Sequence, residues 1–361
     1  MRNPGGRALS VWLLGSPALV VSMVAFSCQS NPARAEEPKA WAAANLDDLV
    51  ELYRHFHAHP ELSFLEKETA ARLAKELKAV GAEVTEGVGG TGVVGVLKNG
   101  AGRTVMVRTD LDALPVTEKT GLAYASQATA KTAAGETGVM HACGHDIHIT
   151  NLIGTARWFA AHKDAWQGTL VLIGQPAEER GSGAKQMLAD GLFTRFPKPD
   201  YALALHCDAE LATGRVGVRG GYALANVDSV DITLVGKGGH GAYPHATIDP
   251  IVMAAQLVLS LQTIVSREIK PIEPCVITVG SIHAGTKHNI ISNECELQLT
   301  VRSYTDEVRQ QLHDAIVRRT KAVAAGAGAP EPKIVFSEGT PAMFNDEKLA
   351  ARVRAVFARE L

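Results

Sequence analysis

The chain has 361 residues, of which 46% are hydrophobic and 20% are charged, and its formal net charge is -2 at pH 7. This length suits two folded domains, and interspersed charges of both signs without a basic face argue against a nucleic-acid-binding protein. The ordinary content of 34 Gly and 16 Pro argues against a coiled coil, a collagen-like chain or wholesale disorder.

The N-terminus has the composition of a cleavable export signal. Arg2 and Arg7 precede an apolar run over residues 11–26, and a small-x-small site follows at residues 33–35. These are the positive, apolar and cleavage regions of a signal peptide. We therefore expect residues 1–35 to be removed as a signal peptide, which leaves a periplasmic or secreted protein without a membrane segment.

Two alternatives to cleavage stay open. The apolar run approaches the length of a spanning helix, so an uncleaved membrane anchor is one of them. Lipid attachment at Cys28 is the other, although Phe26 fits such a site poorly. Cysteines further along the chain are candidates for disulfides in an exported protein, at positions 143, 207, 275 and 295. However, Cys143 stands between two histidines, which points to a different role.

The first half of the remaining chain mixes helical and strand patterns. Apolar residues at helical spacing predict helices over residues 46–59, 68–80 and 149–162. Short β-rich runs without strict alternation predict strands over residues 104–109, 169–173 and 201–205. Such runs are typical of strands buried on both faces, as in a parallel sheet covered by helices. This half is therefore predicted to be α/β.

The second half changes character near Gly220. Apolar and polar residues alternate over residues 230–234 and 295–301, which predicts strands of a sheet with one polar face. A helix is expected from Pro250 to about Arg267 and another after Thr305. These patterns predict a smaller α+β domain over residues 223–332.

Polar clusters stand where three of the predicted strands end and just before a helix. They are Asp110-Leu-Asp112, Gln175-Pro-Ala-Glu-Glu179, His206, and the segment from His141 to His148. Open α/β sheets bind ligands along the carboxyl edge of their strands, so we expect these four segments to converge.

The residue types in these clusters suit a divalent metal. Cys143 and His145 have close chelating spacing, and thiolate, imidazole and carboxylate are ligands that zinc accepts. Of the adjacent Glu178 and Glu179, one can bind metal while the other handles a proton. Each residue alone is more often a core or solvated side chain. Their concurrence at successive strand ends favours the metal site.

These residues also carry a family resemblance. The motifs are DLDALP at 110–115, MHACGHDIH at 140–148, QPAEE at 175–179, LALH at 203–206, GKGGHGAYPHATIDP at 236–250 and HNIISNECELQLTVRS at 288–303. Together they resemble metallo-amidohydrolases of the aminoacylase/carboxypeptidase superfamily, such as hippurate hydrolase, N-acyl-amino-acid amidohydrolases and auxin-conjugate hydrolases. The resemblance implies an α/β catalytic domain with a mixed, largely parallel sheet and an inserted α+β lid and dimerisation domain.

The resemblance implies a division of the chain and a set of partners. The catalytic domain would cover residues 36–222 and 333–361, and the lid residues 223–332. Substrates would be small N-acyl amino acids or peptide-like amides, and a homodimer would form through the lid. Two divalent ions would be the cofactors, with Zn, Mn, Ni and Co all possible.

The resemblance also assigns roles to individual residues. The metal ligands would be Cys143, His145, Glu179 and His206. Glu178 would be the general base that takes a proton from the water activated by the metal ions and passes it to the leaving amine. Asp112 would orient a ligand.

The lid would supply further residues. His240 would stabilise the oxyanion, often from the partner subunit, while Asn289 and Arg302 would hold the substrate amide and carboxylate. In relatives the catalytic domain supplies a last metal-binding His downstream of the lid. Here no His follows His313, so the second catalytic segment is expected to be truncated.

Two rival hypotheses follow. The missing ligand suggests a catalytically inactive metal- or ligand-binding protein. The cysteines suggest an exported, disulfide-stabilised structural domain, in which a disulfide-bonded Cys143 could not be a thiolate ligand.

Overall fold

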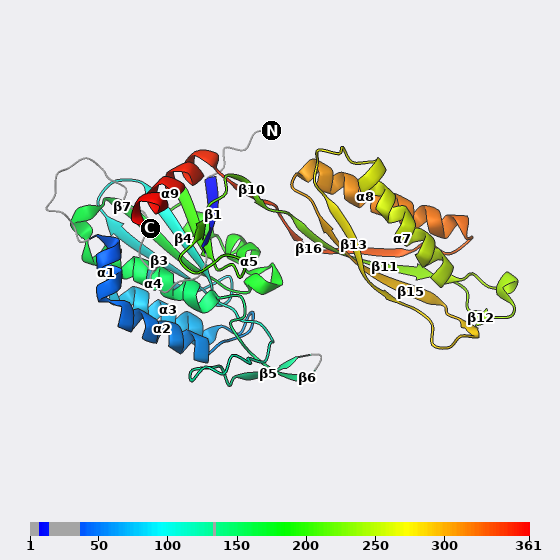
Figure 1. Ribbon diagram of the computed structural model, residues 1–361, viewed down its shortest axis with the longest axis horizontal. Coiled ribbons are helices and arrows are strands. Elements are labelled where there is room, and N and C mark those ends of the chain that lie inside the picture. Colours follow the sequence, from blue (N-terminus) through cyan, green and yellow to red (C-terminus); the bar gives the residue numbers. More distant parts are fainter. Residues whose placement is uncertain (1–6, 14–36, 133–134) are drawn as a thin grey trace. The chain divides into compact units, whose positions relative to one another are not determined.

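The computed structural model describes residues 7–13, 37–132 and 135–361 (Figure 1). They form two units, one of residues up to Gly221 with Phe344–Leu361 and the other of Tyr222–Met343. The second unit is thus inserted into the first. Its end lies later than the expected residue 332, because β16 (Lys333–Thr340) pairs with β11 (Val227–Val235) inside the inserted unit.

The first unit is built on a seven-stranded mixed sheet. Its strands are β1 (Arg7–Leu13), β2 (Glu83–Val88), β3 (Gly92–Asn99), β4 (Thr104–Asp110), β7 (Gly168–Gln175), β8 (Tyr201–His206) and β9 (Val216–Gly217). They are ordered β2-β3-β7-β4-β8-β1-β9, and β4 pairs in parallel with both β7 and β8. The predicted α/β class with a mixed, largely parallel central sheet is confirmed.

Strand β1 differs from the expectation for the N-terminus. It lies within the first 35 residues, yet it pairs in parallel with β8 from Arg7↔Tyr201 to Trp12↔His206. A strand edge presents unpaired N–H and C=O groups, and an apolar segment of the same chain can satisfy them. The rest of the expected signal, residues 1–6 and 14–35, lies outside the described residues.

Helices cover both faces of this sheet (Figure 1). On one face lie α1 (Pro38–Ala44), α2 (Leu46–Ala58), α3 (Lys67–Ala79), α4 (His145–Ala161) and α9 (Glu347–Glu360), and beyond the other lie α5 (Gly183–Ala189) and α6 (Leu192–Arg195). Along β3 the side chains alternate, because Val93 packs with the α2–α4 core while Val94 packs with Met187 of α5. This two-sided burial explains why the strands read as continuous apolar runs.

The inserted unit is a four-stranded antiparallel sheet with two helices. Its order is β13-β15-β11-β16, where β13 covers Val276–His283 and β15 covers Glu294–Arg302. Helix α7 (Pro250–Arg267) begins at Asp249, whose side chain accepts the Ile251 N–H, and α8 (Asp306–Gly326) begins at Thr305. Short strands complete the described chain: β5 (Thr129–Thr132), β6 (Gly135–Gly138), β10 (Gly221–Leu224), β12 (Gly239–His240), β14 (Ile290–Ile291) and β17 (Met343–Asn345).

Candidate metal centre

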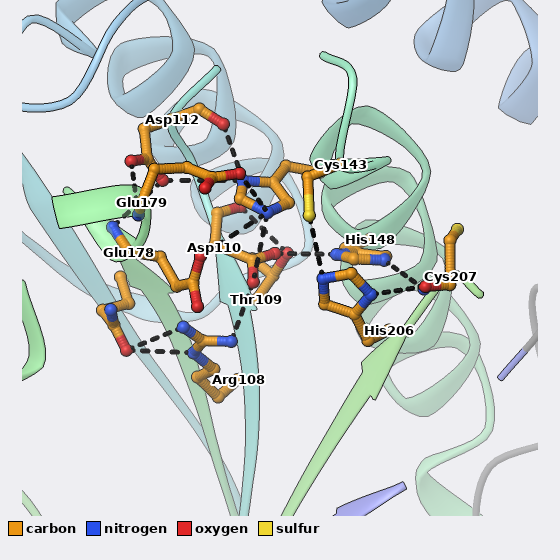
Figure 2. Close-up of polar contacts among 12 residues, drawn as sticks. Arg108, Thr109, Asp110, Asp112, Cys143, His148, Glu178, Glu179, His206 and Cys207 are labelled. Atoms are coloured by element: carbon orange, nitrogen blue, oxygen red, sulfur yellow. Dashed lines mark hydrogen bonds and ion pairs between the residues drawn. The ribbon is translucent and has the colours of Figure 1, made fainter. Parts of the chain in front are cut away.

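The polar clusters predicted from the sequence converge at the carboxyl ends of three adjacent strands. Asp110 ends β4, Gln175 ends β7, and His206 ends β8. Helix α4 adds its first residue, His145, to the same place, four residues earlier than the predicted helix start. The first turn of α4 directs polar side chains such as His148 into the cluster (Figure 2). The apolar helical pattern therefore starts only after this turn.

The four predicted ligands lie together. Single ligand atoms of Cys143, His145 and Glu179 are within 4.8 Å of one another. Cys143 Sγ lies 3.2 Å from His206 Nε2 (Figure 2), and His145 Nε2 lies 3.8 Å from Glu179 Oε1. Sulfur, nitrogen and oxygen donors therefore face a common point, as in divalent metal sites.

Two ligand atoms of this set lack a hydrogen-bond partner in the described part of the chain, although they lie within ion-pair distance of each other. His145 Nε2 and Glu179 Oε1 are buried and accept or donate no hydrogen bond there. Burying such atoms unpaired is costly, so a bound cation explains them. His145 Nδ1 donates to the Asp112 carbonyl at 2.6 Å, and His206 Nδ1 donates to the Cys207 carbonyl. Each of these bonds orients its ring so that Nε2 is directed toward the cluster.

Gly144 lets Cys143 and His145 share one site. Its φ is 78°, a left-handed conformation that favours glycine, and a Cβ there would lie 2.9 Å from Cys207 Sγ. A glycine is therefore favoured at this position of the CGH motif both by the backbone conformation and by the short distance to Cys207.

His148 lies within the cluster but does not have a free ring nitrogen. Nδ1 donates to Asp110 Oδ1 at 2.8 Å, and Nε2 accepts the Cys207 N–H at 2.8 Å (Figure 2). Both nitrogens are therefore committed to positioning Asp110 and the residue after His206. A ring nitrogen of His148 nevertheless lies within 4.8 Å of single ligand atoms of Asp110, His145 and His206, and these four residues are a second group that could hold a metal ion.

Arg108 is a site residue that the sequence analysis missed. Its Nη1 donates to Asp110 Oδ2 at 2.8 Å, and its Nε and Nη2 donate to Gln175 Oε1 (Figure 2). Burial would raise the pKa of Asp110, but Arg108 and His148 hold it well below its ordinary value. Residues two apart on a strand share a face, so the position of Arg108 relative to Asp110 was a usable signal.

Asp112 holds the turn that carries both glutamates. Its Oδ1 accepts the Glu178 N–H at 3.1 Å, and its Oδ2 accepts the Glu179 N–H at 3.0 Å and the Ser63 hydroxyl at 2.6 Å. Burial alone would raise the pKa of Asp112, yet the hydrogen bonds from His145 and Ser63 lower it. Asp112 therefore acts on the turn through backbone amides.

The two glutamates differ in exposure. The Glu178 side chain is 37% exposed and that of Glu179 is 20% exposed. Burial raises the pKa of both carboxyls. The more exposed Glu178 places Oε2 3.9 Å from His145 Nε2, so it borders the cluster and retains access to solvent.

The cluster is rich in acidic groups around one cationic ring. Burial would lower the pKa of His145, but Asp112, Cys143 and Asp110 raise it to about 11. The hydrogen bond with His145 lowers the pKa of Cys143, whereas burial and the charges of Glu179 and Glu178 raise it overall. This concentration of negative charge favours a bound cation.

The lid-domain candidates fall at two ends of the inserted unit. His240 lies on β12, where the Ala242 N–H donates to its Nδ1 at 3.1 Å, and the Asn289 carbonyl accepts the Gly241 N–H at 2.9 Å. Asn289 Oδ1 is buried without a partner among the residues described. Arg302 is the last residue of β15 and pairs with Val276 at the opposite end of that strand from Glu294.

The four cysteines of the described ranges are free thiols, at positions 143, 207, 275 and 295. The hypothesis of a disulfide-stabilised structural domain is therefore wrong. Cys143 faces His206 because strand β8 ends beside the start of α4.

His57 of α2 anchors the start of α4 and was also missed. It donates through Nδ1 to Asp146 Oδ2 at 2.7 Å and through Nε2 to Glu118 Oε1 at 3.0 Å. The hydrogen bond to Asp146 outweighs burial and, with the Glu118 contact, raises the pKa of His57 to about 9.

This contact predicts a pH-dependent stability. Because folding raises the pKa of His57, its protonated form stabilises the fold fully below pH about 6.5, and that stability is lost as pH rises through about 9. We therefore compare the free energy of unfolding of the wild type and of His57→Gln in urea titrations. The difference between the two should decrease by about 3 kcal/mol from pH 6 to pH 10. Identical pH slopes for the two proteins would contradict this.

Comparison with known proteins gives a consistent set of similarities. Residues 106–361 match the model of Peptidase family M20/M25/M40. The chain is 38% identical over 307 residues to N-acetyl-L-cysteine deacetylase of Bacillus subtilis (strain 168), covering 85% of this chain and 71% of that protein. It is 36% identical over 305 residues to N-acyl-L-amino acid amidohydrolase of Geobacillus stearothermophilus, covering 81% and 80%.

Solved structures agree in fold. A putative aminohydrolase from methicillin resistant Staphylococcus aureus superposes with a TM-score of 0.76 at 36% identity, covering 86% of this chain and 77% of that chain. The Bacillus subtilis YXEP protein, described as a dinuclear metal binding peptidase from M20 family, gives a TM-score of 0.73 at 31% identity, covering 88% and 81%.

Proposed function

This chain belongs to Peptidase family M20/M25/M40, and we propose that it is a metal-dependent amidohydrolase that cleaves the amide bond of N-acyl amino acids. The observation that carries the proposal is the cluster of buried ligand atoms on His145 and Glu179 that make no hydrogen bond in the described chain, set beside the more exposed carboxylate of Glu178. Relatives named for N-acyl amino acids and N-acetylcysteine support this substrate class.

Cys143, His145, Glu179 and His206 would hold two divalent ions, and their mixed donors suit Zn, Mn, Ni or Co. When bound, the ions would supply Lewis acidity that polarises the scissile carbonyl and acidifies the attacking water. Arg108, Asp110, Asp112 and His148 keep the surrounding side chains and turns in place through the hydrogen bonds described above.

Glu178 would act as the general base. Its carboxylate would accept the proton of the attacking water and return it to the nitrogen of the leaving amino acid. Burial raises its pKa above the ordinary value of a glutamate, which makes the carboxylate a stronger proton acceptor. The peptide N–H of Glu178 is held by Asp112, so the side chain starts from a fixed backbone.

His240 would stabilise the oxyanion as a neutral donor. The Ala242 N–H occupies Nδ1 as a hydrogen-bond donor, so the ring proton of neutral His240 is on Nε2. That N–H is the group that an oxyanion accepts. Asn289 would bind the substrate amide, and Arg302 would bind its carboxylate through the two-pronged guanidinium.

The geometry of the inserted unit supports a homodimer with shared sites. Strand β15 separates Arg302 from Glu294 by eight residue steps, or about 26 Å. His240 and Asn289 lie beyond the Glu294 end of that strand, on β12 and on the segment before β14, which pairs with β12. One inserted unit therefore does not present all three residues to one small substrate. We infer that the partner subunit contributes His240 and Asn289.

Mixing two inactive variants tests this arrangement. Homodimers of His240→Ala and of Arg302→Ala should each lose most activity. After subunit exchange, half of the dimers are mixed, and each mixed dimer has one intact site. Activity should therefore recover to about a quarter of wild type. No recovery, despite exchange shown by mass spectrometry of intact dimers, would place all three residues in one subunit's site.

A direct assay tests the proposed reaction. The full chain, loaded with Mn²⁺ or Zn²⁺ and analysed for metal per chain, is incubated with N-benzoyl and N-acetyl amino acids and with the same compounds as carboxamides. We expect release of the free amino acid only where the carboxylate is free. Two bound ions without turnover of any N-acyl amino acid would favour the inactive, ligand-binding alternative.

The export signal remains our proposal for the N-terminus, supported by Arg2, Arg7 and the small residues at 33–35. Cleavage there would remove β1 from the edge of β8. N-terminal sequencing of the protein isolated from its producing cells should begin at Glu36. An intact residue 1 on periplasmic or secreted protein would overturn the proposal.

A further inference from the structure

The turn after β7 has a strained backbone at the position before the two glutamates. Ala177 has a φ of 46° and is fully buried. Together with Phe64, at a φ of 68°, it is one of two non-glycine residues with positive φ in the part of the chain that the structure describes. Such conformations persist only where the surroundings hold them, and they concentrate at functional sites.

Three successive backbone amides of this turn are held by two carboxylates. The Glu178 and Glu179 N–H groups donate to Asp112, as described above. The Ala177 N–H donates to Glu66 Oε1 at 2.7 Å. Glu66 is fully buried, and its other oxygen accepts the Thr91 hydroxyl at 2.6 Å. Asp112 therefore fixes the glutamates, while Glu66 fixes the strained residue before them.

The segment that carries Glu66 is itself tied to the Asp112 loop. The Glu61 carbonyl accepts the Ala113 N–H at 2.7 Å, and Ser63 donates to Asp112 Oδ2 at 2.6 Å. This short stretch between α2 and α3 thus carries one of the carboxylates that hold the glutamate turn, Glu66, and contacts the other, Asp112. Phe64, the other residue with positive φ, lies within the same stretch.

We propose that Glu66 is a positioning residue that keeps Ala177 in its left-handed conformation and so fixes the directions of Glu178 and Glu179. The inference rests on the proposed function for its catalytic consequence, but the structural consequence is independent of it. Glu66 acts through the backbone amide of Ala177, 111 residues away in the chain. It does not touch the reacting atoms.

The test is Glu66→Met, which keeps the length of the side chain and removes its acceptor. We expect kcat to fall about 10–100-fold, with KM within about threefold, and Zn²⁺ affinity to weaken by a similar factor. In metal-free protein, hydrogen exchange of the peptide covering residues 175–182 should accelerate at least about tenfold. Glu66→Gln keeps an oxygen acceptor for Ala177 and should remain within about threefold of wild type.

Two further variants separate positioning from general damage to the fold. Thr91→Val removes the other hydrogen bond of Glu66 and should leave kcat and exchange of residues 175–182 within about threefold of wild type. Glycine adopts positive φ without strain. The double variant with Ala177→Gly and Glu66→Met should therefore have a kcat about tenfold higher than that of Glu66→Met alone. Where Glu66→Met does not fold, Glu66→Asp, too short to reach Ala177, takes its place.

The outcomes are distinguishable from those of the proposed function. If wild type binds metal but hydrolyses no N-acyl amino acid, the proposed function fails while the exchange and metal-affinity measurements still test Glu66. Unchanged exchange over residues 175–182 in Glu66→Met or its Asp substitute would overturn the positioning role. Failure of Ala177→Gly to rescue kcat would also overturn it.

Discussion

Replacing Glu178 with Gln should lower kcat for N-acyl amino acid hydrolysis by about 10²–10⁴-fold, without loss of bound metal or of folding. Glutamine has nearly the same shape but does not take up a proton at neutral pH. The hydrogen bond from the Glu178 N–H to Asp112 involves the main chain, so the substitution leaves the turn intact. Steady-state kinetics, metal analysis and thermal unfolding of the same preparation measure all three quantities.

The neighbouring glutamate supplies the matched comparison. Glu179→Gln weakens a proposed ligand whose Oε1 is buried and makes no hydrogen bond in the described chain, so it should lose metal as well as activity. Glu210→Gln changes an exposed glutamate and should alter neither. If Glu178→Gln loses metal while Glu179→Gln retains it, the two roles are exchanged. Wild-type kcat in Glu178→Gln would remove the general base from this mechanism.

Local sequence patterns were sufficient for the strands that form the site. The apolar runs over β4, β7 and β8 are continuous because helices cover both faces of the sheet, and their polar residues follow at the carboxyl ends. Convergence then follows from parallel pairing, since β4 lies between β7 and β8. The metal cluster was therefore predictable without any knowledge of distances.

Two residues that the sequence did not reveal, unlike Arg108, act only through long-range pairs. Glu66 holds Ala177 across 111 positions, and His57 holds Asp146 across 89. Neither partner is marked by periodicity, because a hydrogen bond between distant segments depends on how whole elements pack. The predicted end of the inserted domain at residue 332 lies earlier than its end at Met343 in the structure, for a related reason. Strand β16 pairs with β11 about a hundred residues earlier, and the Ala- and Gly-rich stretch before it reads as the end of a domain.

Sequence proximity is a poor guide to the distance between the lid residues. Asn289 and Arg302 are 13 positions apart and look like parts of one substrate pocket. Most of that interval is the extended strand β15, which carries Arg302 to the far end of the sheet. A β-strand converts a short sequence interval into a large distance. The resemblance implied a contribution of His240 from the partner subunit, and the length of β15 extends that proposal to Asn289.

Replacing Cys143 with Ala should abolish hydrolysis, with a loss of at least about 10³-fold in kcat/KM, and should lower the metal content by at least one ion per chain. The thiol faces His206 Nε2 at 3.2 Å and belongs to the same cluster as His145 and Glu179. Burial and the nearby glutamates raise its pKa. A coordinating cation reverses that preference and stabilises the thiolate. Metal analysis after dialysis against chelator-treated buffer, followed by kinetics with added Mn²⁺ or Zn²⁺, measures the effect.

Two companion variants determine what the sulfur does. Cys143→Asp supplies a carboxylate oxygen, another accepted metal ligand, and should keep more metal and activity than Cys143→Ala. Cys275→Ala removes a half-buried thiol of the inserted unit and should retain wild-type metal content. If Cys143 were instead a nucleophile, Cys143→Asp should keep its full metal content and have no turnover. The aspartate variant therefore separates metal ligation from covalent catalysis at a residue that lies close to both His145 and His206.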